Sequence, residues 1–292
     1  MKPFPRFYHL AAARFRCSLL ITFLILLVAF ASCSPRREES RSEPFGVFLG
    51  METAKLWHDV EARYGRSVRT ERPLELEVNA EAVVTDDGTP VIRIRESAAP
   101  TEVRIAHELL HLHMVSEGFA YSIEPRFSSG SVTPENLALF RRTAEVVHNG
   151  VLHWMFYPKL RSMGMNPSEE FSGQLADAFF IRAASAEAMT ETDLALNFFK
   201  ASVEIDDAEI PERLAAHYLA SGWQGPLDIG RAMAEPVTTS RPDSPQREVD
   251  VFLACMNRLF KESVAFSVLG QTTQRRGAIQ IITVTVSVGV KS

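Results

Sequence analysis

The chain has 292 residues, 46% of them hydrophobic, which suffices for one large domain or two small ones. Acidic residues (36) outnumber basic residues (31), and no basic cluster exceeds a pair such as Arg275-Arg276. This balance excludes nucleic acid from the expected partners. A disulfide framework is excluded as well, because Cys17 and Cys33 lie in the N-terminal segment and leave Cys255 alone. The apolar neighbours of Cys255 predict a buried thiol without a catalytic role.

The first 32 residues have the pattern of a secretory signal peptide. A basic leader precedes an apolar run from Ser18 to Phe30, which is shorter than the roughly 20 residues of a membrane-spanning helix. The small residues of Ala29-Phe-Ala31 fit ordinary signal cleavage, which would release a secreted or periplasmic protein.

The sequence Phe30-Ala-Ser-Cys33 resembles the lipobox of bacterial lipoproteins, with phenylalanine in place of the usual leucine at its first position. The resemblance implies that Cys33 is lipidated and anchors the mature chain in the bacterial cell envelope. The same resemblance implies, from Ser34 after the cysteine, the periplasmic side of the outer membrane. Residues 33–48 would then form a tether, since they are rich in Ser, Arg, Glu and Pro.

Local patterns after the tether predict a small sheet with helices on one side. Apolar residues at helical spacing favour a helix over Leu49–Tyr64. Alternating apolar and acidic residues predict a half-exposed strand at Leu74–Val78. Ala82–Thr85 and Val91–Arg95, joined by an Asp-Asp-Gly turn, predict a β-hairpin.

The stretch from Thr101 to Gly118 predicts a helix that carries metal ligands. Thr101 suits the N-cap and Gly118 suits the C-terminal stop. His107 and His111 project from one helical face, where both imidazoles can reach a single ion. Glu108 would lie beside that ion, where it can take a proton from a metal-bound water molecule.

The motif His107-Glu108-Leu-Leu-His111 resembles the His-Glu-x-x-His signature of the zincin metallopeptidases. The resemblance implies a zinc ion, hydrolysis of amide bonds, and a sheet whose edge strand holds the substrate backbone. Val91–Arg95, which precedes the motif helix, is the strand expected to align the substrate.

A second functional helix is expected at Pro134–Met163, after a polar loop at Phe119–Thr133. Catalytic zinc sites normally have three protein ligands, and Glu145 on this helix is the favoured third ligand. The arrangement resembles the glutamate-zincins, with Asn149 in place of the aspartate that orients a zinc-bound histidine. The amide oxygen of Asn149 can still accept the imidazole N–H.

His148, one turn from Glu145, is the alternative third ligand. If Glu145 binds the metal, His148 is instead expected to be catalytic, by donating a hydrogen bond to the oxyanion of the tetrahedral intermediate. His153 and Tyr157 are weaker candidates for that hydrogen bond and are expected to be structural.

The remainder of the chain predicts helices and a terminal hairpin. The helices are expected at Pro167–Met189, Thr190–Ile205, Pro211–Ser221, Leu227–Ala234 and Pro245–Lys261. The charges around Glu204 are interpreted as a solvated helix end. Apolar and β-branched residues at 263–269 and 278–288 predict a hairpin that turns near Gly277.

Together these patterns predict an α+β fold: a small mixed or antiparallel sheet with zincin-like active-site helices, then a mostly helical region and a terminal β-hairpin. The expected divisions are a signal peptide (1–32), a tether (33–48), a catalytic domain (49–165) and a helical region (166–292). The expected function is a zinc metallopeptidase that cleaves peptides or proteins and is anchored through Cys33. The motif does not separate peptide bonds from other amides. The alternative is a non-catalytic envelope lipoprotein that binds partner proteins and holds structural zinc.

Overall fold

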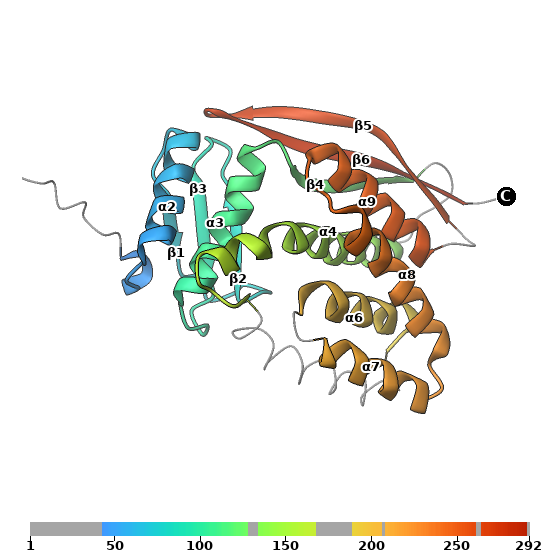
Figure 1. Ribbon diagram of the computed structural model, residues 1–292. Coiled ribbons are helices and arrows are strands. Elements are labelled where there is room, and N and C mark those ends of the chain that lie inside the picture. Colours follow the sequence, from blue (N-terminus) through green and yellow to red (C-terminus); the bar gives the residue numbers. More distant parts are fainter. Residues whose placement is uncertain (1–42, 128–133, 168–188, 206–207, 261–263, 291–292) are drawn as a thin grey trace, which may run out of the picture. The chain divides into compact units, whose positions relative to one another are not determined.

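The computed structural model describes residues 43–127, 134–167, 189–205, 208–260 and 264–290 (Figure 1). From Pro44 onward the chain forms one compact unit. Its described residues contain seven α-helices, a short 3-10 turn at Pro44–Gly46 and two three-stranded sheets, which confirms the expected α+β fold. None of these helices is long and apolar enough to cross a membrane. The signal peptide and Cys33 lie outside the described residues.

The first sheet consists of β1 (Arg69–Glu71), β2 (Ala80–Val84) and β3 (Pro90–Ile94), in the order β1-β3-β2. β2 and β3 form the predicted antiparallel hairpin, and Gly88 has the φ of 86° that its turn requires. β3 is the central strand, because β1 pairs with it in parallel on the other side. The expectation that the strand at Val91–Arg95 is a sheet edge is therefore wrong, and the edges are β1 and β2.

The strand predicted at Leu74–Val78 is also wrong. This segment lies in the connection between β1 and β2, and Leu74 and Val78 are 78% and 45% exposed. An alternating sequence becomes a strand when its apolar face packs against a core, and these two apolar side chains face solvent instead.

Helices α2 (Met51–Tyr64) and α3 (Glu102–Ser116) pack against each other beside this sheet (Figure 1). α2 confirms the first predicted helix. The shared core includes Val60, Ile105 and Leu109, all fully buried. Burial of each such side chain contributes about 1.5–3 kcal/mol, so this packing holds α3 firmly against the sheet.

The second sheet contains β4 (Ala120–Phe127), β5 (Val264–Arg276) and β6 (Ile279–Val290), in the order β4-β6-β5. β5 and β6 form the predicted terminal hairpin, which turns at Gly277. β4 contradicts the polar loop expected at Phe119–Thr133, because it pairs in parallel with β6 from the far end of the sequence. Such a partner is not visible in the local pattern, although it is what stabilises the strand.

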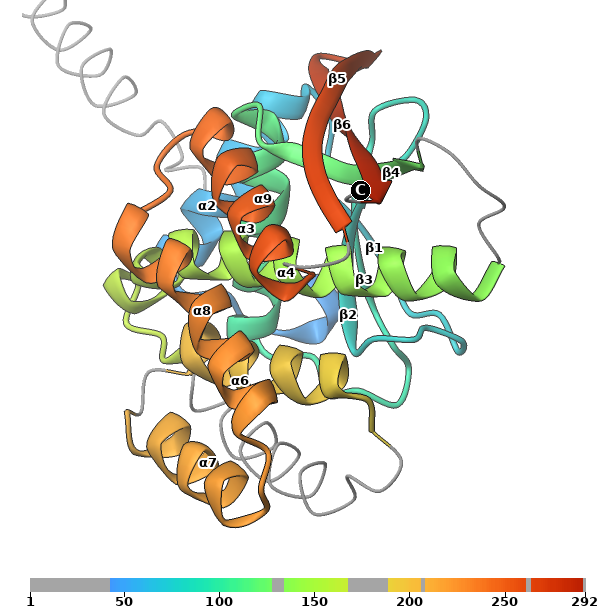
Figure 2. The ribbon, with the colours of Figure 1, turned by 90° about the vertical axis from the view of Figure 1, so that its right-hand side faces the viewer.

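The remaining helices are α4 (Pro134–Ser162), α6 (Glu191–Glu204), α7 (Glu209–Ala220), α8 (Gln224–Ser240) and α9 (Pro245–Leu259). α6, α8 and α9 contact α4, and α7 packs against α6 and α8 (Figures 1 and 2). α4 confirms the second predicted helix and continues through Pro158. It packs against β4, α6 and α9, so it connects the second sheet to the C-terminal helices. Most of the helix predicted at Pro167–Met189 lies outside the described residues.

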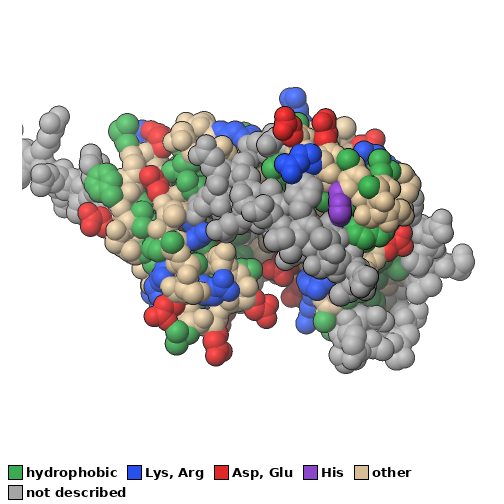
Figure 3. All heavy atoms as spheres, turned by 90° about the horizontal axis from the view of Figure 1, so that it is seen from below, with side chains coloured by type: hydrophobic (Ala, Val, Ile, Leu, Met, Phe, Trp, Pro, Cys, Tyr) green, Lys and Arg blue, Asp and Glu red, His purple; other side chains and the backbone are tan. Residues whose placement is uncertain are grey.

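Charged side chains of both signs are interspersed with hydrophobic ones on the face shown in Figure 3. Among the described residues, large exposed apolar side chains include Met51, Leu74 and Leu269, which belong to α2, the β1–β2 connection and β5. The features that concentrate polar groups lie instead inside the unit, between α3 and α4.

Candidate metal centre

Two histidines of helix α3 form one side of the site. Thr101 caps this helix as predicted, since its Oγ1 accepts the backbone N–H of Arg104 at 3.2 Å. His107 and His111 are one turn apart, and their Nε2 atoms lie 3.2 Å from each other. The motif spacing thus brings both imidazoles to one point, as predicted.

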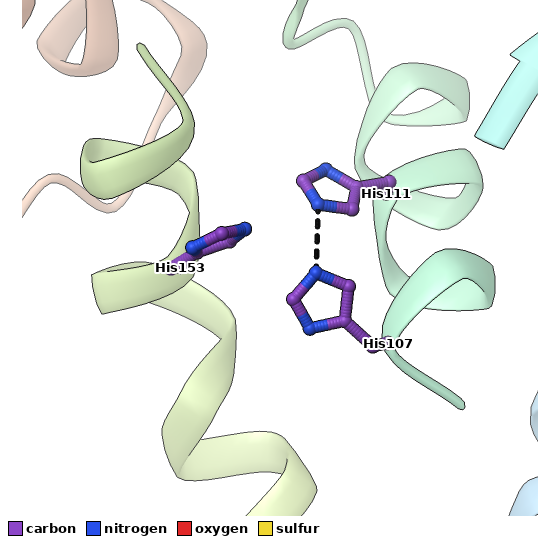
Figure 4. A group of neighbouring side chains, drawn as sticks. All are labelled: His107, His111 and His153. Atoms are coloured by element: carbon purple, nitrogen blue, oxygen red, sulfur yellow. Dashed lines mark hydrogen bonds between the residues drawn. The ribbon is translucent and has the colours of Figure 1, made fainter. Parts of the chain in front are cut away.

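A third imidazole comes from helix α4. His153 points toward His107 and His111 (Figure 4), and its ring centroid lies 4.7 and 5.3 Å from theirs. Each of the three histidines offers one ring nitrogen, and these three nitrogens all lie within 4.8 Å of one another. The three residues therefore form a group, called here the histidine group, that can hold a metal ion.

Helix α6 supplies a carboxylate that orients His153. Glu204 Oε1 lies 3.2 Å from His153 Nδ1, and Lys200 Nζ lies 3.6 Å from Glu204 Oε2. Because Nδ1 is engaged, Nε2 of His153 remains for a metal. Burial alone would raise the pKa of Glu204, but Lys200 and His153 outweigh it and keep this pKa below its ordinary value. The interpretation of Glu204 as a solvated helix end is wrong, because Glu204 is 5% exposed and bound to a histidine.

Aromatic rings restrain the histidine group. Tyr157 stacks on His153 with 8° between the ring planes and 5.3 Å between the centroids. Phe156 meets His107 and His111 edge-on, at centroid distances of 5.1 and 4.9 Å. These contacts favour particular ring orientations, which holds the donor atoms in place before any ion arrives.

The protonation states of His107 and His111 suit a metal. Burial, reinforced by the neighbouring His153, holds the pKa values of His107 and His111 well below their ordinary range. Both rings are therefore neutral at neutral pH, as metal binding requires. In a tetrahedral zinc site the ligand nitrogens lie about 3.3 Å apart, close to the 3.2 Å between His107 Nε2 and His111 Nε2. The donor set is compatible with zinc.

Glu145, the expected third ligand, is exposed on α4. Among the described residues, the group whose donor atoms meet around one point contains His153 and lacks Glu145. Glu145 lies on the wall of the neighbouring cavity. Glu145 and His153 share one face of α4, two turns apart, and the packing of α4 brings the turn of His153 to α3. The geometry thus favours His153 over Glu145 as the third ligand.

His148, the alternative third ligand, is also absent from this group and binds a carboxylate of α9. His148 Nε2 lies 2.5 Å from Glu248 Oε1, and Glu248 Oε2 accepts the backbone N–H of Ala120 at 3.1 Å. Glu248 is fully buried. Sequence reasoning missed Glu248, although it lies four residues before Phe252 on the apolar face of α9. A carboxylate within an apolar stripe is the signal that indicates such a buried partner.

A cavity of about 800 Å³ opens beside the histidine group, and its lining includes Glu108, His148 and strand β2. Glu108 is 6% exposed. Burial, reinforced by Glu81 and opposed by Arg104, raises the pKa of Glu108 to about 8. A carboxyl group with such a pKa exchanges its proton near neutrality, which suits general acid–base chemistry.

Comparison of the chain with protein-family models, curated proteins and solved structures finds no match. The zincin resemblance therefore rests on His107, Glu108 and His111. A third ligand from a later helix was expected, and the residue that joins the pair is His153. The signal for it was its position, four residues after Asn149 on the face that also carries Glu145.

Proposed function

We propose that the protein is a zinc-dependent metallopeptidase. The observation that carries the proposal is the meeting of three imidazoles with the buried carboxyl of Glu108 beside one cavity. His107, His111 and His153 would hold the ion, without Glu145. Structural zinc sites are usually closed by four protein ligands, so a three-histidine group beside an 800 Å³ cavity favours catalysis over a purely structural ion.

Zinc held by these imidazoles would supply Lewis-acid activation of a water molecule and of the substrate carbonyl. Glu108 would take the proton of the attacking water and return it to the leaving amine. Burial, reinforced by Glu81, raises the pKa of Glu108 in the metal-free protein. The positive charge of a bound zinc ion would lower this pKa again, which favours the carboxylate that accepts the proton of water.

His148 would present a second polar group to the substrate. Glu248 engages its Nε2, so Nδ1 is the nitrogen that remains. When Nδ1 carries a proton, it would stabilise negative charge on the substrate carbonyl oxygen. Glu248 would act as a positioning residue, since it fixes the ring from the buried side.

Strand β2 would align the substrate, in place of the central strand first expected. β2 is an edge of its sheet and contributes Ala80 and Ala82 to the cavity lining. Extended peptides bind such edges through backbone hydrogen bonds. This arrangement supports a peptide or protein substrate over other amides.

The same proposal includes anchoring in the bacterial cell envelope, through a lipid on Cys33. An anchored chain would act on peptides outside the cytoplasm, on the periplasmic side of the outer membrane. Mass spectrometry of the mature N-terminal peptide tests this part. A lipidated Cys33 would support it, whereas an unmodified N-terminus after Ala31 would indicate a secreted or periplasmic protein.

Substitution of the general base tests the catalytic proposal. Glu108→Gln is expected to keep one zinc ion per chain and to lower peptide hydrolysis by about 10²–10⁴-fold, the usual contribution of a general base. Zinc content is measured by mass spectrometry of the metal, and hydrolysis is measured on a random peptide mixture. Glu117→Gln, at the exposed end of the same helix, is the matched control and should retain activity.

Two results would contradict this proposal. Undiminished hydrolysis by Glu108→Gln would refute the role of Glu108. Absence of hydrolysis by the zinc-loaded wild type, together with a stable protein partner, would favour the non-catalytic lipoprotein.

A further inference from the structure

The backbone of β2 is open on the side away from β3. The Thr85 N–H donates to Thr89 O at 3.1 Å, which marks a hydrogen-bonded pair at the end of the hairpin. In an antiparallel ladder, hydrogen-bonded and non-hydrogen-bonded pairs alternate. The pairs formed by Val84, Ala82 and Ala80 are therefore the non-bonded ones. These three residues direct their N–H and C=O groups away from β3, toward the free edge.

This edge is closed at Val84 by two side chains from the second sheet. The backbone N–H of Val84 donates to Tyr121 Oη at 3.4 Å, and Arg276 Nη1 donates to the Val84 carbonyl at 2.6 Å. The Arg276 guanidinium lies 6.0 Å from the centre of the Tyr121 ring and 3.3 Å from Asp86. Val84 is 3% exposed and its side chain belongs to the core of the first sheet. Tyr121 and Arg276 are called here the edge cap.

The opposite end of β2 is exposed. Glu77, Val78 and Asn79 line the cavity there and are exposed, with Val78 at 45%. Tyr121 lines the same cavity at the closed end. The cavity lining thus follows β2 from exposed residues at one end to Tyr121 of the edge cap at the other.

We infer that the proposed peptidase binds the end of a polypeptide, or a short peptide, and does not cleave in the middle of a long chain. An extended segment pairs with the free backbone groups of Ala80 and Ala82. It stops at the edge cap, because Val84 has already given its N–H and C=O to Tyr121 and Arg276. The inference rests on the proposed function for cleavage, although the pairing itself can be measured without turnover.

Amide hydrogen exchange tests the pairing. Zinc-loaded Glu108→Gln is mixed with random tetrapeptides, so that bound peptide is not consumed. Exchange at the Ala80 and Ala82 amides is expected to slow by at least about tenfold, since they gain hydrogen bonds. The Glu81 amide is the internal control, because it already belongs to the ladder with β3. Unchanged exchange at both alanines would overturn the inference.

Peptide length tests the edge cap. Random tetrapeptides are compared with the same mixture extended by six residues at the amino end, at the carboxyl end, or at both. We expect an extension at one of the two ends to leave binding to Glu108→Gln unchanged. Extension at both ends should weaken this binding by at least about tenfold. Equal binding of the double extension would overturn the inference, as would cleavage of long, doubly blocked peptides at internal bonds by the wild type.

Variants of the cap complete the test. Added to Glu108→Gln, Tyr121→Phe, which removes only the hydroxyl, and Arg276→Gln are each expected to restore binding of the doubly extended peptides by at least about threefold. Arg275→Gln, exposed on the neighbouring position of β5, is the matched control and should not. No recovery in either cap variant would refute the role of the cap. If the wild type hydrolyses nothing while Ala82 is protected, the proposed catalysis fails and the docking of a chain end stands.

Discussion

Helix α4 carries two histidines that each bind a buried carboxylate of another helix. His148 binds Glu248 of α9 at 2.5 Å, and His153, five residues later, binds Glu204 of α6 at 3.2 Å. Both carboxylates are buried, at 0% and 5% exposure. Glu204 engages Nδ1 of its histidine, whereas Glu248 engages Nε2.

The two carboxylates differ in the group that each contacts besides its histidine. Glu248 also accepts the backbone N–H of Ala120, so the first pair ties α4 to the start of β4. Glu204 faces Lys200 instead, and its histidine joins His107 and His111. One histidine–carboxylate pair therefore connects α4 to the second sheet, and the other orients a member of the histidine group.

The largest expected difference between the pairs is in metal affinity. His153→Ala removes a proposed ligand and is expected to lower zinc affinity by more than about 100-fold, beyond the usual effect of losing only a partner of a ligand. His148→Ala should change zinc affinity by less than about threefold. Competition with a chromophoric chelator measures both. Loss of zinc in Glu145→Ala, with zinc retained in His153→Ala, would instead restore Glu145 as the third ligand.

Substitutions of the two carboxylates are expected to affect different properties, Glu248 the stability of the fold and Glu204 the affinity for zinc. Glu248→Ala should lower the free energy of unfolding of the metal-free protein by about 3–5 kcal/mol, because it leaves His148 and the Ala120 N–H buried without their partner. Glu204→Ala should lower zinc affinity by about 10–100-fold. Urea unfolding and the chelator assay measure the two effects.

Glu248→Gln is the conservative control for that comparison. Its amide oxygen can still accept the N–H of Ala120, so it should recover part of the lost stability. Equal stability of Glu248→Ala and the wild type would show that the His148 pair does not hold the sheet.

The smallest expected effect concerns Cys255 on α9, the helix that carries Glu248. Burial raises the pKa of this thiol to about 12, and its Sγ–H donates to the Met233 carbonyl at 3.2 Å. At pH 8 only about one thiol in ten thousand is ionised, so alkylation by iodoacetamide should be very slow with or without zinc. Alkylation that is fast only after zinc has been removed would indicate that the histidine group and α9 unfold together.

Local sequence was sufficient wherever the structure depends on neighbouring residues. The cap at Thr101, the hairpin with Gly88, the helix spacing of His107 and His111, and the terminal hairpin were all predicted and are confirmed. The buried state of Cys255 was predicted as well. These features follow from turn chemistry and periodicity, which act over a few residues.

Contacts between distant segments could not be predicted in this way. β4 forms because β6 arrives beside it, and Leu74–Val78 fails to form a strand because no core covers its apolar residues. The open edge of β2, and the cap that Arg276 places on it, depend in the same way on how the two sheets meet.

The sequence by itself determined that two imidazoles and a carboxyl group share one helix, because helical spacing alone sets their directions. Only the tertiary structure decided that His153 joins them and that Glu204 and Glu248 become buried partners. Each of these choices depends on which turn of one helix faces another. The crossing angle and the offset between two helices come from side-chain packing across the whole core, and no local sequence pattern contains them.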